Sequence, residues 1–384
     1  MEPIEFRKPH SPGRCPPVPE ITERDRERYL RTIDTRLTPE QVARIVHPGT
    51  VYTRQENVLA VHWHPEFVPL TLIRKRYEAL FPNRRLELVI PTQHNILLSH
   101  GDFAGVEVDC HSRGFNRKVQ LLLHFKKERL NRAGTLESML SHTFKYRSSQ
   151  LFDLMHTFTK PVEERLQAAA RTTAAGEDLV CFVQDVVRKI EVLMEEYWDA
   201  TPAEAVKNKL LRNYLDLLRQ EHDPRLIERA QAYVRAVKKI VKAEFPLTYF
   251  YRTSEIIEEA RSLGGGVVIP HPEQFWPILM ADYDVDGFEV WNPGSRKYTE
   301  FLITVLNRKN RSLGHGMRRQ LVFMGDDTHM GEKVKDPVRQ DPDKASREIG
   351  VQPAWDDPRI SKQCRIAESE RSRVITEYRE RLEG

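Results

Sequence analysis

Two histidines one residue apart follow a short apolar run: Val58-Leu-Ala-Val61 leads into His62, Trp63 and His64. A short apolar run bounded by polar residues is typical of a buried β-strand. Because alternate side chains of a strand point to the same side, His62 and His64 are expected to face the same way. Two adjacent imidazoles are a good pair of metal ligands, although such pairs also arise by chance on surfaces and in cores.

The same arrangement, an apolar run that ends at or passes through a potential metal ligand, recurs along the chain. The runs predict seven strands, and the helical patterns between them imply parallel pairing. In a closed parallel barrel the carboxyl ends of the strands meet at one mouth, so these side chains would converge. Buried imidazoles and carboxylates need partners, and divalent Zn, Mn or Fe would supply them. The residues are His62 with His64, His94, Glu107, His124, His271, Glu289, and Asp327 with His329.

Helices are expected to position these strands. Thr38 to Gln41 form a capping box with proline at the first helical position, which predicts a helix to Val46. The region from about 126 to 262 is expected to be a helical insertion, because Val180 to Met194 shows helical spacing and Thr201 to Glu204 is a second capping box. Helical spacing also appears at 72–81 and 298–307.

The expected domain organisation follows from these patterns. Residues 1–50 form an N-terminal extension, and residues 51–330 form a metal-dependent barrel that is interrupted by the helical insertion at 126–262. Residues 331–384 form a charged C-terminal extension, expected to be a loop to about 362 and then a polar helix to 382.

Composition limits the function. The chain has 384 residues and a formal net charge of +4, which does not call for a nucleic-acid partner. No apolar run approaches the length of a membrane span, and the N-terminus has no apolar signal region, so no membrane partner is expected. The four cysteines have no paired spacing, which indicates reduced thiols and a cytoplasmic location. A homo-oligomer is compatible with the sequence.

The motifs together resemble the PHP superfamily, the polymerase and histidinol phosphatase metal-dependent phosphoesterases. The resemblance covers about 58 to 330 apart from the helical region, and it implies a distorted (β/α)7 barrel of PHP type with two or three divalent metal ions at its mouth. The matching segments, in the family's order, are His62-Trp-His64, Thr92-Gln-His94-Asn95, Gly105-Val-Glu107, the run ending at His124, His271-Pro272, Gly287-Phe-Glu289-Val-Trp-Asn292 and Gly325-Asp-Asp327-Thr-His329.

Site roles are carried over by position. The resemblance implies that one metal is held by His62, His64, Glu107 and Asp327, and that Glu107 bridges to a second metal held by His124 and His271. His94 and His329 match two ligands of a third site. Its usual further ligand is not evident after His64, where Glu66 is the nearest carboxylate. Glu107, Asp327 and His329 are the catalytic candidates.

The expected reaction is hydrolysis of a small-molecule phosphate ester by a metal-activated hydroxide. Arg113, Glu289, Asn292 and Arg296 lie at or after strand ends and are candidate substrate contacts, although solvated loop charge also explains the arginines. Two alternatives stay open. One is a nuclease or phosphodiesterase acting on nucleic acid, which the modest charge does not favour. The other is a non-catalytic PHP barrel that binds a partner or serves as a scaffold.

Overall fold

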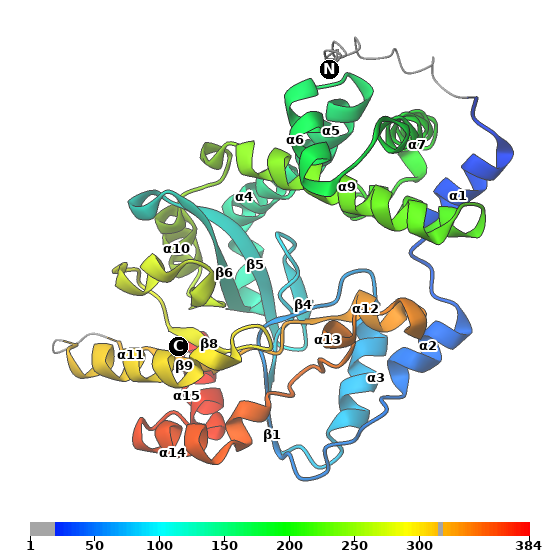
Figure 1. Ribbon diagram of the computed structural model, residues 1–384. Helices are drawn as coiled ribbons and strands as arrows, with labels where there is room; N and C mark the ends of the chain where they lie inside the picture. Colours follow the sequence, from blue (N-terminus) through cyan, green and yellow to red (C-terminus); the bar gives the residue numbers. More distant parts are fainter. Residues whose placement is uncertain (1–19, 314–317) are drawn as a thin grey trace, which may run out of the picture. The chain divides into compact units, whose positions relative to one another are not determined.

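The computed structural model of the protein describes residues 20–313 and 318–384. The described chain divides into two compact units, whose helices and strands are labelled in Figure 1. Each unit has its own buried core. Unit 1 comprises residues 20–34 and 147–245, and unit 2 comprises 35–146 and 246–384. His10, Cys15, His315 and the first 19 residues of the expected N-terminal extension lie outside the described residues.

Unit 1 is helical and packs around buried aromatic side chains, among them Tyr29, Phe158 and Tyr233. The helical spacing after Val180 is confirmed, because the helix there buries Val183, Ile190 and Met194 along one face. The helices are α1 (Glu23–Ile33), α5 (Tyr146–Thr159), α6 (Glu163–Thr173), α7 (Glu177–Glu196), α8 (Lys209–Leu217) and α9 (Pro224–Glu244).

The helix expected to start at Thr201 is absent from the described chain, where the next helix, α8, begins only at Lys209. The Thr201 hydroxyl donates a hydrogen bond to the carbonyl of Tyr197, 2.8 Å away, in the preceding turn. A threonine caps a helix by accepting a bond from the backbone two or three residues ahead. Here the side chain is instead directed backwards, so the capping box predicted from sequence does not form.

Unit 2 contains three sheets. In two of them a pair of short strands runs parallel: β1 (Asn57–Ala60) with β3 (Leu86–Val89), and β2 (Trp63–His64) with β10 (Thr328–His329). The third sheet has six strands in the order β4 (Leu98–His100), β5 (Phe103–Ser112), β6 (Arg117–Lys126), β7 (Gly266–Ile269), β8 (Gly287–Trp291) and β9 (Leu321–Met324).

The expectation of an all-parallel closed barrel is wrong for these strands. Strands β4 to β7 pair antiparallel, only β7 to β9 pair parallel within the large sheet, and the strands of the described residues form no closed barrel. The long strands β5 and β6 (Figure 1) are joined by the short turn η1 (Arg113–Phe115) and Asn116. A parallel pair needs a crossover of a dozen or more residues. Because this link is much shorter, the two strands must pair antiparallel.

Backbone hydrogen bonds link the ends of the separate sheets. The amide of Asn95 donates to the carbonyl of Glu107 at 2.7 Å, and the amide of Glu107 donates to Gln93 at 3.2 Å, which joins the chain after β3 to β5. The amide of Asp327 donates to the carbonyl of His62 at 2.9 Å. These bonds hold the chain after β3 beside the middle of β5, and they hold the chain after β9 beside the chain after β1.

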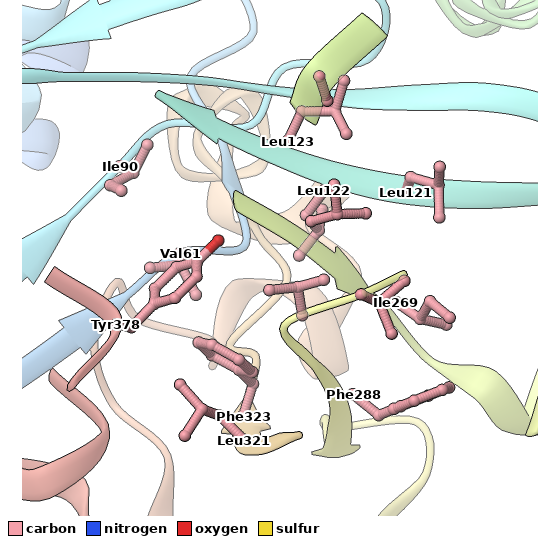
Figure 2. Close-up of a cluster of buried hydrophobic side chains, with 14 of the residues drawn as sticks. Val61, Ile90, Leu121, Leu122, Leu123, Ile269, Phe288, Leu321, Phe323 and Tyr378 are labelled. Atoms are coloured by element: carbon pink, nitrogen blue, oxygen red, sulfur yellow. The ribbon is translucent and has the colours of Figure 1, made fainter. Parts of the chain in front are cut away.

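The core of unit 2 lies on the large sheet. Figure 2 shows Leu122 of β6, Phe288 of β8 and Phe323 of β9 with Tyr378, and the rings of Phe323 and Tyr378 lie 4.8 Å apart between centroids. Helices α4 (Gly134–Phe144), α10 (Thr253–Ser262), α11 (Thr299–Arg311), α14 (Pro358–Ile366) and α15 (Arg371–Glu383) contribute to this core, whereas α2 (Pro39–Val46) and α3 (Leu70–Leu80) pack with β1 in a second core cluster of the same unit. None of the helices in the described ranges is both long and apolar enough to cross a bilayer.

The charged tail is more structured than expected. Between 330 and 362 it contains α12 (Met330–Val334), α13 (Pro342–Ala345) and a 3-10 turn (Pro353–Asp356). The single polar helix expected to end at 382 is two helices, α14 and α15. They are separated near Glu368, whose positive φ of 49° does not belong to a right-handed helix.

Candidate metal centre

The structure brings together all of the predicted metal ligands except His124. His64 lies in β2, Glu107 in the middle of β5 and His329 in β10. The remaining ligands follow strands: His62 follows β1, His94 follows β3, His271 follows β7 and Asp327 follows β9. The ends of the apolar runs therefore converge, although the sheets differ from those expected.

Glu107 is the central carboxylate, and its two oxygens face different imidazoles. Oε1 lies 3.8 Å from Nε2 of His62 and 3.5 Å from Nε2 of His271. Oε2 lies 3.6 Å from Nε2 of His64 and 2.5 Å from Nδ1 of His94. The side chain is 1% exposed, so its charge is balanced by these neighbours rather than by water.

Asp327 faces the cluster with one oxygen only. Its Oδ1 lies 3.7 Å from Nε2 of His62 and 3.5 Å from Nε2 of both His64 and His329. The ring of His64 is stacked between those of His94 and His329, at centroid distances of 4.4 and 4.3 Å. Three imidazoles and two carboxylates thus surround the ring of His64.

Several buried nitrogens of this cluster have no hydrogen-bond partner among the described residues. They are Nε2 of His62, both ring nitrogens of His64 and Nδ1 of His271. A buried polar atom without a partner costs roughly 1–3 kcal/mol, so a group of them at one place indicates a missing partner. Imidazole nitrogens beside carboxylate oxygens match divalent Zn, Mn or Fe. Two sets of ligand atoms are close enough to share an ion, because all atoms of each set lie within 4.8 Å of one another. One set comes from His62, His64 and Glu107, and the other from His64, His94 and His329.

The electrostatics differ sharply between neighbouring rings. Burial disfavours the charged form of His62, but the carboxylates of Glu289 and Asp327 outweigh it and raise the pKa to about 10. Burial and the nearby rings of His329 and His94 lower the pKa of His64 to about 3. Burial opposes ionisation of Glu107 as well, yet the surrounding histidines hold its pKa well below the usual value. The neighbouring carboxylates thus favour the charged form of His62, whereas burial and the adjacent rings favour the neutral form of His64.

Glu289 orients His62 from the side away from the cluster. Its Oε1 lies 2.7 Å from Nδ1 of His62, and its Oε2 accepts bonds from the amide of His271 at 3.0 Å and from the side chain of Asn292 at 3.3 Å. Carboxylates in this position typically fix the orientation of a metal-binding imidazole. The structure thus places Glu289 and Asn292, predicted as substrate contacts, behind the ligands.

His124 is not brought into the cluster. Its Nδ1 lies 2.7 Å from the Tyr378 hydroxyl and its Nε2 lies 3.0 Å from the carbonyl of Val61, so both ring nitrogens have other partners. The reason is the antiparallel pairing of β6, which puts its carboxyl end beside the start of β5, with His124 opposite Gly105. A strand-end histidine was expected at the mouth only because parallel strands were assumed.

The two arginines predicted as substrate contacts are exposed. Arg113 lies in the turn after β5, six residues beyond Glu107, which corresponds to roughly 20 Å along a strand. Arg296 starts the 3-10 turn after β8 (Arg296–Tyr298) and forms no ion pair with the described residues. Neither contacts the cluster.

Two further side chains touch the cluster. The Nη1 group of Arg347 donates to Oδ2 of Asp327 at 2.6 Å, and Oε1 of Glu66 lies 3.6 Å from Nδ1 of His329. Glu66 could be found from its place after His64. Arg347 carries no signal in the sequence, because it is one of many basic residues in a tail expected to be a loop.

Comparison with known proteins finds a distant structural similarity and no related family. No family model matches the chain, and no curated protein matches it. Among solved structures it is similar to a candidate metal-dependent phosphoesterase from Bifidobacterium adolescentis, with 16% identity and a TM-score of 0.41, covering 83% of this chain and 97% of that one. Similarity at this level does not establish a common fold.

Proposed function

We propose that the protein is a metal-dependent phosphoesterase that hydrolyses a phosphate ester of a small molecule. The observation that carries the proposal is the buried group of unpartnered imidazole nitrogens beside Glu107 and Asp327. Such a group is costly without cations and is the usual donor set of multinuclear hydrolases. The modest net charge of +4 supports a small substrate over nucleic acid.

The proposed ligands follow the contacts. His62, His64, Glu107 and Asp327 would hold one divalent ion, and Glu107 with His271 would hold a second. His94 and His329, together with Glu66, would hold a third where it is present. Bound metals would lower the pKa of water so that hydroxide is available near neutral pH, and would neutralise charge on phosphoryl oxygens.

The chain's own residues supply position and access. Glu289 holds the ring of His62, and Glu107 provides negative charge to both sides of the cluster. The side chains of His94, His329 and Asp327 are about a quarter exposed (25%, 25% and 27%), whereas His62, His64 and Glu107 are almost fully buried. A phosphate ester would therefore approach from the side of His94 and His329.

The same proposal includes an open and distorted variant of the PHP-type barrel, in a cytoplasmic protein. The parallel order β7-β8-β9 supports this variant, as do the bonds that join His62 to Asp327 and Gln93 to Glu107 across the ends of the separate sheets. Cys110, Cys181 and Cys364 form no disulfide with one another in the part of the chain that the structure describes, which supports a reducing location.

The test combines metal analysis with a panel of phosphate esters. We expect at least two transition-metal ions per chain after gentle purification, and phosphate release that requires Mn²⁺ or Zn²⁺. His142→Gln, which removes a ring bonded to the carbonyl of Tyr249, is the control that keeps its metal. Less than one ion per chain, with no uptake of added metal, would overturn the proposal. Salt-sensitive binding and cleavage of single-stranded DNA, without release of phosphate from small esters, would favour a nuclease instead.

A further inference from the structure

The two carboxylate oxygens of Asp327 have different partners. Oδ1 faces the imidazoles of His62, His64 and His329, while Oδ2 accepts a hydrogen bond from Nη1 of Arg347 at 2.6 Å. The same Nη1 also donates to the backbone carbonyl of Asp327 at 3.0 Å. Arg347 thus holds this residue by both its side chain and its backbone.

Asp327 needs such support because its backbone is in an unfavourable conformation. Its φ is +47°, in the left-handed region that residues other than glycine rarely occupy. Its amide donates to the carbonyl of His62 at 2.9 Å, and its carbonyl accepts from Arg347. These two bonds fix the peptide groups on both sides of the strained residue, and with them the direction of the carboxylate.

Arg347 is itself held in place by the segment that follows it. The amide of Gly350 donates to Oδ2 of Asp326 at 2.9 Å, and the side chain of Gln352 donates to the carbonyl of Leu59 at 2.7 Å. Glu348 pairs with Arg76 at 2.5 Å and with Lys333 at 2.8 Å. The side chain of Arg347 is only 14% exposed. The guanidinium is therefore part of a fixed scaffold beside the cluster.

We propose that Arg347 is a positioning residue of the metal centre, an inference that rests on the metal-binding part of the proposed function. By occupying Oδ2, the guanidinium leaves Oδ1 as the oxygen that Asp327 offers to a metal, and it prevents chelation through both oxygens. A planar guanidinium with several donors can hold a carboxylate and a carbonyl together, which a flexible ammonium does less well. The C-terminal extension thus contributes to the site without supplying a ligand.

The experiment measures metal affinity rather than turnover. Mn²⁺ is titrated by calorimetry into metal-stripped protein whose fold is checked by circular dichroism. Arg347→Gln is expected to weaken Mn²⁺ binding by roughly 10–100-fold, the usual effect of removing a group that orients a ligand. Arg347→Lys should recover part of this loss because it keeps the charge.

The matched control is Arg381→Gln. Arg381 also donates from one nitrogen to a buried carboxylate and the carbonyl of the same residue, Asp286, at 3.2 and 3.3 Å, but away from the cluster. Both glutamine variants should lower the melting temperature, while only Arg347→Gln should weaken Mn²⁺ binding. Combined with Asp327→Asn, Arg347→Gln should weaken binding by less than the product of the two single effects.

The outcomes separate this inference from the proposed function. The positioning role alone would be overturned by any of three results. These are wild-type Mn²⁺ affinity in folded Arg347→Gln, an equal loss of Mn²⁺ affinity in Arg381→Gln, and full additivity of the affinity losses of Arg347→Gln and Asp327→Asn. If Arg347→Gln does not fold, Arg347→Met takes its place, and wild-type affinity in that variant, or full additivity of its effect with that of Asp327→Asn, would overturn the positioning role. Failure of the wild-type protein to bind Mn²⁺ or Zn²⁺ would overturn the proposed metal centre, and this inference with it.

Discussion

Nδ1 of His62 lies 2.7 Å from Oε1 of Glu289, and Nε2 of the same ring faces the carboxylates of Glu107 and Asp327. A hydrogen bond at one ring nitrogen fixes which nitrogen is left for a metal. The same contact helps to raise the pKa of His62 to about 10 against the effect of burial. Glu289 therefore determines both the orientation of His62 and its charge before metal binds.

Replacing Glu289 with glutamine tests this relationship. The amide can still accept a bond from His62 but carries no charge, so we expect roughly 10–100-fold weaker Mn²⁺ binding. Calorimetric titration of metal-stripped protein measures the affinity. Glu87→Gln, which changes a carboxylate bound to Tyr77 and Arg84 outside the cluster, should leave the affinity unchanged. Equal affinities in the two variants would contradict the role of Glu289.

Glu107→Gln should lose more bound metal than Asp327→Asn. Both oxygens of Glu107 face imidazoles, whereas only Oδ1 of Asp327 does. A bridging carboxylate offsets the repulsion of two cations roughly 3.5–4 Å apart, while a terminal carboxylate serves one. Elemental analysis of the folded variants gives the stoichiometry, and both should lose phosphoesterase activity by orders of magnitude. Full occupancy and activity in Glu107→Gln would show that the bridge is wrongly assigned.

The pH dependence of stability should report the buried ring of His124. Burial lowers the pKa of His124 to about 4, although the hydrogen bond that the Val61 carbonyl accepts from the ring raises it. In the unfolded chain the pKa is near 6.5. Between these values the unfolded state binds more protons. The stability that the protein gains from keeping His124 neutral is therefore fully present above pH 6.5 and is lost as the pH falls towards 4. On lowering the pH from 7 to 5, metal-stripped His124→Gln should lose about 2 kcal/mol less unfolding free energy than the wild-type protein.

Urea denaturation at the two pH values makes this comparison. The same variant should keep the metal content of the wild-type protein, since both ring nitrogens of His124 have partners outside the cluster. Loss of metal from folded His124→Gln would instead restore the role expected from sequence.

Gly325→Ala should damage the site through Glu289. A Cβ atom at position 325 would lie 1.5 Å from Oε1 of Glu289 and 3.0 Å from Nδ1 of His62. We expect a loss of about 1–3 kcal/mol in unfolding free energy, typical of overpacking, together with weaker metal binding. The same substitution in a Glu289→Ala background should cost less stability, because the clashing carboxylate is gone. Gly134→Ala, where a Cβ meets nothing within 4 Å, is the control.

The convergence of the ligands was predictable from sequence because it depends on local order. His62, His94, His271 and Asp327 each follow an apolar run, and an apolar run predicts a buried strand whatever its partner. The direction of pairing was not predictable in this way, because periodicity carries no information on it. Nine residues lie between the apolar runs that end at Asp109 and begin at Val119, and the sequence does not show that they extend both strands into a tight hairpin rather than forming a longer crossover.

The contacts of Arg347 and Tyr378 depend on tertiary packing of segments far apart in sequence. Arg347 meets Asp327 across 20 residues of tail, and Tyr378 meets His124 across 254 residues. Neither side chain has a distinctive local pattern. The hydrogen bond of the Thr201 hydroxyl was not predictable either. The motif shows only that the hydroxyl could cap a helix, and in the structure it bonds to the carbonyl of Tyr197 in the preceding turn instead.

The division of unit 2 into two stretches, 35–146 and 246–384, has a consequence for biosynthesis. His62, His64 and His94 leave the ribosome before the whole of residues 147–245, and Asp327 leaves after it. At roughly 5–20 residues per second, the synthesis of the chain from His94 to Asp327 takes about 10–50 seconds. During that time the nascent chain carries histidines without the aspartate or Arg347, and β2 lacks its partner strand β10. Complete metal loading is therefore a late event that follows translation of the C-terminal stretch.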